Sequence, residues 1–157
     1  ANGIEVMGRH CGDIALYAGV AGGAESIIVP EVGLDIDEIC KKAIQGKNRG
    51  KLHHIMVLAE GVGNAYDLAE QIVDKTGIDT RVTILGYIQR GGNPTSYDRI
   101  IGSEMGHRAI ELLKDNKDGR ALGVKCNKII DLDINEALEM KKEFNLEMYN
   151  TAKVLSI

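Results

Sequence analysis

Short apolar segments alternate, over the first half of this chain, with segments whose apolar residues recur at helical spacing. We interpret four apolar segments as strands: Ile4–Met7, Ile27–Val29, His54–Ala59 and Arg81–Leu85. The helical stripes between them fall at about 13–21, 36–45 and 65–76. Such alternation with short connections is typical of an α/β fold, in which a mainly parallel sheet carries helices on both faces.

Local signals sharpen the expected ends of these elements. Asp13 is a candidate N-cap for the first helix, and Asp35, with Glu38 three residues later, resembles a capping box for the second. Gly46 is expected to end that second helix. The strand at 54–59 shows little polar alternation, so we expect it to be buried on both faces.

The pattern changes after residue 85. A loop rich in glycine and polar residues, "GYIQRGGNPTSYDR", leads into a long helix expected at about Ser96–Lys114. Two short strands are expected within "ALGVKCNKIIDLDI", and a helix at about Asn135–Met140 leads into a tail. The long helix carries one apolar face, made by Ile101, Met105, Ala109 and Leu112.

Composition and net charge are typical of a globular protein and argue against some functional classes. With 157 residues, 44% hydrophobic and 27% charged, the chain can bury a sizeable core. A net charge of −4 argues against a nucleic-acid binder, and no apolar run has the length of a membrane span. Three widely spaced cysteines fit reduced thiols in a cytoplasmic protein rather than a zinc site.

Ligands of parallel sheets bind beyond the carboxyl ends of the strands. Gly8-Arg9, Glu60-Gly61 and the segment 87–90 follow three of the expected strands. Arg9 and Arg90 adjoin glycines, so that backbone amides and a guanidinium group can approach one anion together. With Arg81 they favour a phosphate ligand, although each arginine alone could make an ordinary surface ion pair.

Two further groups have a functional and a simpler interpretation. Glu60 could accept hydrogen bonds from sugar hydroxyls or bind a cation, or it could be an acid at the start of the next helix. The basic cluster Lys47, Arg49, Lys51, His53 and His54 could bind an anion or form a solvated surface, and Glu25 could be a surface acid. The sequence has no phosphate-binding Gly-x-x-x-x-Gly-Lys-Ser/Thr loop, no Gly-x-Ser-x-Gly elbow and no His-Glu-x-x-His motif.

Three motifs carry a resemblance to a known family. "EVMGRHCGDIAL", "AGVAGGAESIIVPE" and "TRVTILGYIQRGGNPTSYDR" resemble, in order and spacing, the bacterial ATP-dependent 6-phosphofructokinases. The resemblance runs from Ile4 to about Gly123 and corresponds to the C-terminal half of family members. It implies that the ATP-binding loop and the aspartate base lie in residues that precede Ala1, so that the 157-residue chain alone is expected to be inactive.

The resemblance also implies a substrate site. Met7, Gly8 and Arg9 match the motif that lines the fructose 6-phosphate site, and Arg9 would stabilise the phosphoryl group during transfer. Glu60 matches an acid that hydrogen-bonds the sugar. Arg90 matches an arginine on the 6-phosphate, and Arg81 matches one that reaches this phosphate across a subunit boundary. Tyr87 replaces a common histidine, which places direct phosphate contact there in doubt.

The same resemblance implies a regulatory site and partners. Gly23, Glu25, Arg49, Lys51 and His53 match the region that binds an effector, ADP or phosphoenolpyruvate, and Glu25 matches an acid associated with the effector's magnesium. Mg²⁺ is also implied with ATP, bound mainly by residues outside this chain, and the family assembles as a homotetramer.

The resemblance implies a division of the chain and leaves alternatives open. Residues 1–88 would form a sugar-phosphate and effector domain, 89–139 would return toward the ATP domain, and 140–157 would supply a helix and tail that rejoin the first domain. A non-catalytic sensor of phosphorylated ligands and a pyrophosphate-dependent relative are the competing hypotheses.

Overall fold

The computed structural model describes residues 1–156 and divides the chain into two compact units. One unit consists of residues 1–91 together with the chain from Phe144 onward, and the other consists of residues 92–143. Within residues 1–156, no helix is both long and apolar enough to cross a bilayer.

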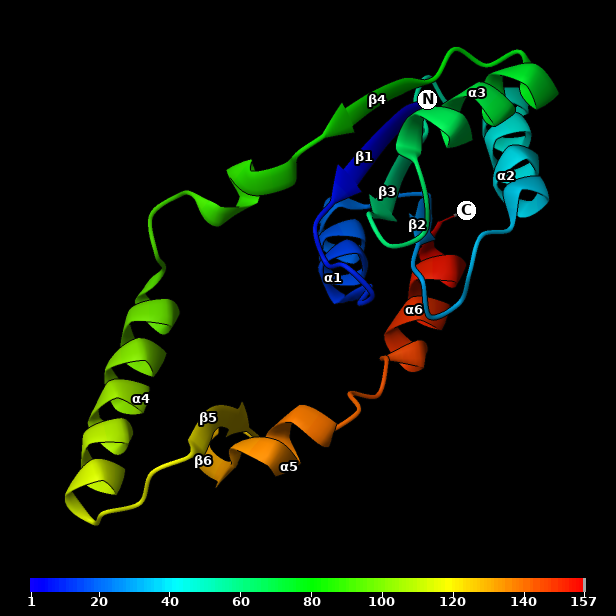
Figure 1. Cartoon of the computed structure of the whole chain (residues 1–157). Coiled ribbons are helices and arrows are strands. Elements are labelled where there is room, and N and C mark those ends of the chain that lie inside the picture. Colours follow the sequence, from blue (N-terminus) through cyan, green and yellow to red (C-terminus); the bar gives the residue numbers. More distant parts are fainter. Residues whose placement is uncertain (157) are drawn as a thin grey trace. The chain divides into compact units, whose positions relative to one another are not determined.

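The first unit is built on a four-stranded parallel sheet (Figure 1). Its strands are β1 (Asn2–Val6), β2 (Ser26–Ile28), β3 (Ile55–Ala59) and β4 (Arg81–Ile84), in the spatial order β2-β3-β1-β4. β1 lies in the middle and pairs with β3 from Asn2↔Ile55 to Val6↔Ala59, and with β4 from Asn2↔Arg81 to Glu5↔Ile84. The predicted α/β class with a parallel sheet is confirmed.

Helices cover both faces of this sheet. α1 (Asp13–Gly22) and α6 (Leu146–Leu155) pack on one face, and α2 (Ile36–Asn48) and α3 (Ala65–Thr76) pack on the other. β3 contributes to both cores, because alternate residues of a strand point to opposite faces. Val57 and Ala59 join the α1–α6 core, whereas Met56 and Leu58 join the α2–α3 core. The prediction that this strand is buried on both faces is therefore confirmed.

Some predicted helix ends need correction. The N-cap of α1 is Gly12 rather than Asp13, which is the first helical residue. Asp35 does cap α2, and its side chain accepts a hydrogen bond from the Glu38 amide. Gly46 does not end α2, which continues to Asn48, because a single glycine lowers helix stability without blocking the hydrogen-bond pattern. The tail contains α6, capped by Asn145.

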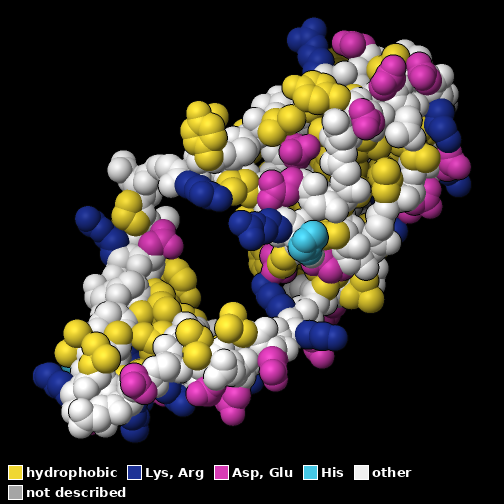
Figure 2. Space-filling view, viewed as in Figure 1, with side chains coloured by type: hydrophobic (Ala, Val, Ile, Leu, Met, Phe, Trp, Pro, Cys, Tyr) yellow, Lys and Arg dark blue, Asp and Glu magenta, His cyan; other side chains and the backbone are white. Residues whose placement is uncertain are grey.

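The second unit contains α4 (Ser96–Lys114), a hairpin of β5 (Arg120–Lys125) and β6 (Lys128–Asp133), and the short helix α5 (Ile134–Glu139). Thr95 and Asp98 form a capping box at the start of α4. Asp131 on β6 accepts from Arg108 of α4 at 2.8 Å and from Arg120 of β5 at 2.7 Å, which ties the helix to the hairpin. Figure 2 shows hydrophobic side chains exposed along this segment.

The connections of the first unit create a ligand-binding position. The chain leaves β1 into α1 on one face of the sheet, and it leaves the adjacent strand β3 into α3 on the opposite face. The loops after β1 and β3 therefore diverge, which opens a crevice at the carboxyl ends of these strands. Ligands of open α/β sheets bind at such a switch point.

Candidate functional site

Glu60 organises the loop that follows β1. It comes directly after β3, and its Oε1 atom accepts hydrogen bonds from the amides of Gly8, at 3.1 Å, and Arg9, at 2.8 Å. These amides, together with the positive charges of Arg9 and Arg90, lower the pKa of the Glu60 carboxyl below its usual value. The side chain is therefore an anion at neutral pH. The interpretation of Glu60 as an acid starting the next helix is wrong, because Asn64 caps α3.

The backbone at Arg9 has an uncommon conformation. Its φ of 51° lies in the left-handed region, which few residues other than glycine adopt. Gly61 lies against it so closely that a Cβ atom at position 61 would overlap the Arg9 carbonyl oxygen. The two loops after β1 and β3 thus depend on each other for their shape, and Gly61 is required by close approach rather than by its own flexibility.

A short 3-10 helix, η1 (Gly86–Arg90), completes the crevice after β4. The Met7 amide donates to Oε1 of Gln89 at 2.7 Å, which fixes η1 against the end of β1. The resulting cavity is lined by Met7, Gly8, Arg9, Ile14, Glu60, Gln89 and Arg90. Five of the seven predicted substrate residues therefore line one cavity: Met7, Gly8, Arg9, Glu60 and Arg90.

The groups that line this cavity can bind an anion and a hydroxyl group. Two guanidinium groups, on Arg9 and Arg90, supply donors that match phosphate oxygens. Among the residues that the structure describes, no hydrogen bond reaches Oε2 of Glu60, so this oxygen can accept from a hydroxyl group.

Arg81 and Tyr87 do not line this cavity. Arg81 is the first residue of β4 and lies opposite Asn2, at the amino-terminal edge of the sheet, where its nearest acid is Asp79 at 3.8 Å. The carboxyl and amino edges of a parallel sheet face opposite ways, so Arg81 cannot join Arg9 within one chain. Tyr87 lies on η1 but is 82% exposed.

Three of the five predicted effector residues meet at a second cavity, near the amino-terminal ends of β2 and β3. Glu25, Arg49 and Lys51 line it together with His54, Gln45, Gly46, Lys42, Lys153 and Ser156. Glu25 is buried, and its two oxygens accept from Lys51 Nζ at 3.2 Å and from the Ile55 amide at 2.7 Å. Burial raises the pKa of Glu25, but the Ile55 amide and Lys51 outweigh it, so the pKa is lowered overall.

Two of the predicted effector residues lie outside this cavity. His53 is exposed, whereas its neighbour His54 is buried, lines the cavity and lies 3.2 Å from Ser26 Oγ through Nε2. Gly23 is the left-handed C-cap of α1. Burial lowers the pKa of His54, although nearby Glu25 opposes this shift.

No group of His, Cys, Asp or Glu residues within 1–156 is arranged to hold a metal ion by itself. Glu25 already binds a lysine and a backbone amide. A Mg²⁺ ion at Glu25 would therefore need ligands from a bound phosphate as well, as is usual for this cation.

Comparison with known proteins agrees with the geometry. The family model described as phosphofructokinase matches residues 3–113. The chain belongs to this family. Proteins named ATP-dependent 6-phosphofructokinase are 65% identical in Alkaliphilus metalliredigens, over 100% of this chain, and 58% identical in Clostridioides difficile, over 99% of it. The chain spans about half the length of these relatives, 49% in both cases, and corresponds to their C-terminal half.

Solved phosphofructokinase structures share the fold. The Saccharomyces cerevisiae phosphofructokinase superposes with a TM-score of 0.82 and 30% identity, over 99% of this chain and 23% of that chain. The Pichia pastoris phosphofructokinase in the T-state gives a TM-score of 0.79 and 29% identity, over 98% of this chain and 18% of that chain.

Sequence reasoning missed several residues that line the two cavities. Gln89 directly precedes Arg90 in the glycine-rich segment, and this position was the one sequence signal that could have identified Gln89 as a lining residue. Lys42 and Lys153 lie on different helices, and no local pattern relates them. Only the packing of α6 beside β2 brings these two side chains together.

Proposed function

We propose that this chain supplies the sugar-phosphate half of an ATP-dependent 6-phosphofructokinase, which transfers the γ-phosphate of ATP to the 1-hydroxyl of fructose 6-phosphate. The observation that carries the proposal is the convergence of Arg9, Arg90 and Glu60 on one cavity at the switch point of the sheet. The family membership and the names of the close relatives support the same reaction.

Each residue has a distinct role in this proposal. Arg90 binds the 6-phosphate, and Oε2 of Glu60 accepts from a sugar hydroxyl. Arg9 stabilises the negative charge of the phosphoryl group in transit, the interaction on which such transfers depend. Glu60 has a second role, because its Oε1 atom positions the Arg9 backbone. Met7 and Gly8 form the wall of the site.

The remaining components come from outside these 157 residues. The ATP-binding loop, the base and most ligands of Mg²⁺ would lie elsewhere in the polypeptide, in a cytoplasmic homotetramer. Arg81 is at the opposite edge of the sheet from Arg9, so it would serve the sugar phosphate of a neighbouring subunit, with Tyr87 as a further contact. Residues 89–139 would return toward the ATP domain, and 140–157 would rejoin the sugar-phosphate domain, 1–88.

Calorimetric titration of the 157-residue chain with fructose 6-phosphate tests the binding step. Replacing Arg90 by Ala removes charge-assisted hydrogen bonds to the phosphate and is expected to weaken binding about tenfold or more. Arg99→Ala, an exposed arginine of α4 outside the cavity, is the matched control and should leave the affinity unchanged.

Two results would count against the proposal. One is equal affinity for fructose 6-phosphate and for fructose, because the guanidinium groups would then not be reading the phosphate. The other is phosphoryl transfer from ATP by the purified 157-residue chain, because the proposal assigns the base and the donor site to other residues.

A second candidate function is a sensor of phosphorylated effectors such as ADP or phosphoenolpyruvate. It is favoured by one observation: Arg49, Lys51 and Glu25 line a cavity formed within a single unit. Calorimetry separates the two functions. Binding of an effector with no binding of fructose 6-phosphate would favour the sensor, and loss of effector binding in Arg49→Ala would assign it to this cavity.

A further inference from the structure

The loop that joins β1 to α1, residues 7–12, brings Arg9 to the sugar-phosphate cavity. Oε1 of Gln89 accepts from the Met7 amide and Oε1 of Glu60 accepts from the Arg9 amide, so the first half of the loop is held in place. Arg9 has a left-handed backbone, and such a conformation persists only where the surrounding structure holds it. The second half of the loop, which leads into α1, therefore needs an anchor as well.

Glu31 supplies this second anchor. Its Oε1 atom accepts a hydrogen bond from the amide of Gly12, 19 positions earlier in the chain, at 2.8 Å. Gly12 is the N-cap of α1 and has no side chain that could cap the helix. The amides at a helix start lack partners inside the helix, so the carboxylate of Glu31 satisfies one of them from outside. Its negative charge is also favourable at the positive end of the helix dipole.

Gly12 lies very close to the end of β2. A Cβ atom at this position would lie 2.4 Å from Cβ of Val29 and 2.6 Å from Oε2 of Glu31. Val29 is fully buried, so its side chain has no room to move aside. The close approach and the hydrogen bond to Glu31 together join the start of α1 to the segment that follows β2.

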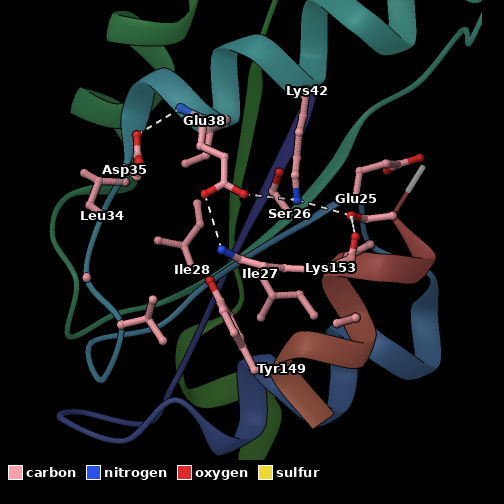
Figure 3. A pocket seen from close by; sticks show the side chains of 16 residues that line it. Glu25, Ser26, Ile27, Ile28, Leu34, Asp35, Glu38, Lys42, Tyr149 and Lys153 are labelled. Atoms are coloured by element: carbon pink, nitrogen blue, oxygen red, sulfur yellow. Dashed lines mark hydrogen bonds and ion pairs between the residues drawn. The ribbon is translucent and has the colours of Figure 1, made fainter. Parts of the chain in front are cut away.

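Glu31 itself extends from a well-held backbone. It lies in a tight turn, in which the Val29 carbonyl accepts from the Gly33 amide at 3.0 Å. Figure 3 shows the chain beyond this turn, where the Asp35 carboxylate accepts from the Glu38 amide at the start of α2. The segment that carries Glu31 is thus fixed on both sides, which suits a residue that positions another loop.

We propose that Glu31 is a positioning residue of the sugar-phosphate site and acts on Arg9 through the loop 7–12. This inference rests on the proposed function. Glu31 does not line the cavity, so its effect is transmitted by the loop and not by contact with the sugar. Without its hydrogen bond, a smaller fraction of the molecules would hold Arg9 and Glu60 in the binding arrangement. The apparent affinity for the sugar phosphate would fall by the same factor.

Amide hydrogen exchange of the 157-residue chain tests the positioning step without a ligand. In Glu31→Ala, the amides of Gly8 and Arg9 should exchange about three- to tenfold faster, although Glu31 bonds to neither of them. Glu31→Gln keeps an oxygen that can accept from Gly12, and it should restore most of the protection. Glu31→Asp keeps the charge but is one carbon shorter, and it should not restore it.

Calorimetry with fructose 6-phosphate measures the consequence for the site. Glu31→Ala and Glu31→Asp should weaken binding about three- to tenfold, and Glu31→Gln by less than about twofold. The matched control is Glu70→Ala, which removes an exposed acid of α3 outside the cavity and should change neither exchange nor affinity. Melting curves establish that the variants remain folded.

Two outcomes would overturn the inference. One is unchanged exchange of the Gly8 and Arg9 amides in Glu31→Ala, and the other is an equal effect of Glu31→Gln and Glu31→Ala. Absence of fructose 6-phosphate binding by the unsubstituted chain would instead count against the proposed function. The exchange measurement would still decide whether Glu31 positions the loop.

Discussion

The two units differ in how much apolar surface they bury. The sheet unit has two hydrophobic cores, one on each face of the sheet. Within residues 92–143, by contrast, Leu112 is the one buried hydrophobic side chain. The second unit instead exposes apolar side chains, among them Tyr97, Ile100, Ile110, Leu113, Leu138 and Met140. Buried apolar area is the main favourable term in folding, so the sheet unit is expected to be the stable part of this chain.

Truncation of one leucine in each unit should give the largest contrast. Leu16 of α1 is fully buried, so Leu16→Ala should lower the free energy of unfolding of the sheet unit by about 2–5 kcal/mol. Leu113 of α4 is 62% exposed, so Leu113→Ala should cost at most about 0.5 kcal/mol. Urea titration followed through amide NMR signals of each unit measures both, and similar costs would contradict the comparison.

Replacement of one glycine in each unit should have effects of opposite sign. Gly61→Ala forces a Cβ atom onto the Arg9 carbonyl, so the loops must shift at a cost of about 1–3 kcal/mol, and fructose 6-phosphate binding should be lost. Gly106→Ala in α4 meets no atom within 4 Å and should stabilise the helix by about 0.5–1 kcal/mol. Melting curves and calorimetry of both variants provide the measurement. Unchanged sugar-phosphate binding in Gly61→Ala would show that the loop contact is unimportant.

Removal of one helix cap in each unit tests how far local damage spreads. Asp35→Ala and Thr95→Ala each delete a side chain that accepts from a backbone amide, at a cost of about 0.5–2 kcal/mol. α2 packs on the sheet, so the loss of stability caused by Asp35→Ala should be spread over the whole sheet unit. α4 packs little, so Thr95→Ala should mainly increase hydrogen exchange in its first turn. Uniform changes across both helices would contradict this difference.

The pH dependence that His54 contributes to stability should be the smallest effect, and it should belong to the sheet unit. Burial lowers the pKa of His54 below 6.5, so the unfolded state binds the proton more readily. The resulting stability is present above the unfolded pKa and is lost as the pH falls through the folded pKa. His54→Asn should therefore flatten the decline in melting temperature below about pH 6.5. A decline that His54→Asn leaves unchanged would contradict this assignment.

The sequence predicted the fold correctly where one short residue pattern specifies a single helix or strand. The stripe at 65–76 predicts one helix and the run at 54–59 predicts one strand, and the structure has α3 at Ala65–Thr76 and β3 at Ile55–Ala59. Asp35 was correctly identified as a cap because capping involves residues three apart. Asp13 was wrong as the cap because Gly12 takes that position. The helix α6 was expected within 140–157 only from the family resemblance, because its weak apolar stripe depends on packing against α1 and β2.

The candidate site was predictable to a similar degree. Arg9, Glu60 and Arg90 follow strands that the sequence reveals, so their presence at the carboxyl edge could be inferred. The sequence could not show that Glu60 holds the amides of Gly8 and Arg9, or that Gln89 fixes η1 to Met7. These contacts join residues more than fifty positions apart, and no short-range periodicity encodes them.

The amino-acid pattern alone determined the α/β class, the order of the elements of the sheet unit and the choice of Arg9 and Arg90 as candidate anion-binding residues, because each follows from neighbours within a few residues. Only the tertiary structure decided the strand order β2-β3-β1-β4, and with it the crevice between the loops after β1 and β3. It also placed Arg81 at the opposite edge of the sheet from Arg9. Those results depend on which strands pair and which faces the helices cover, and these choices are fixed by packing between segments distant in the chain.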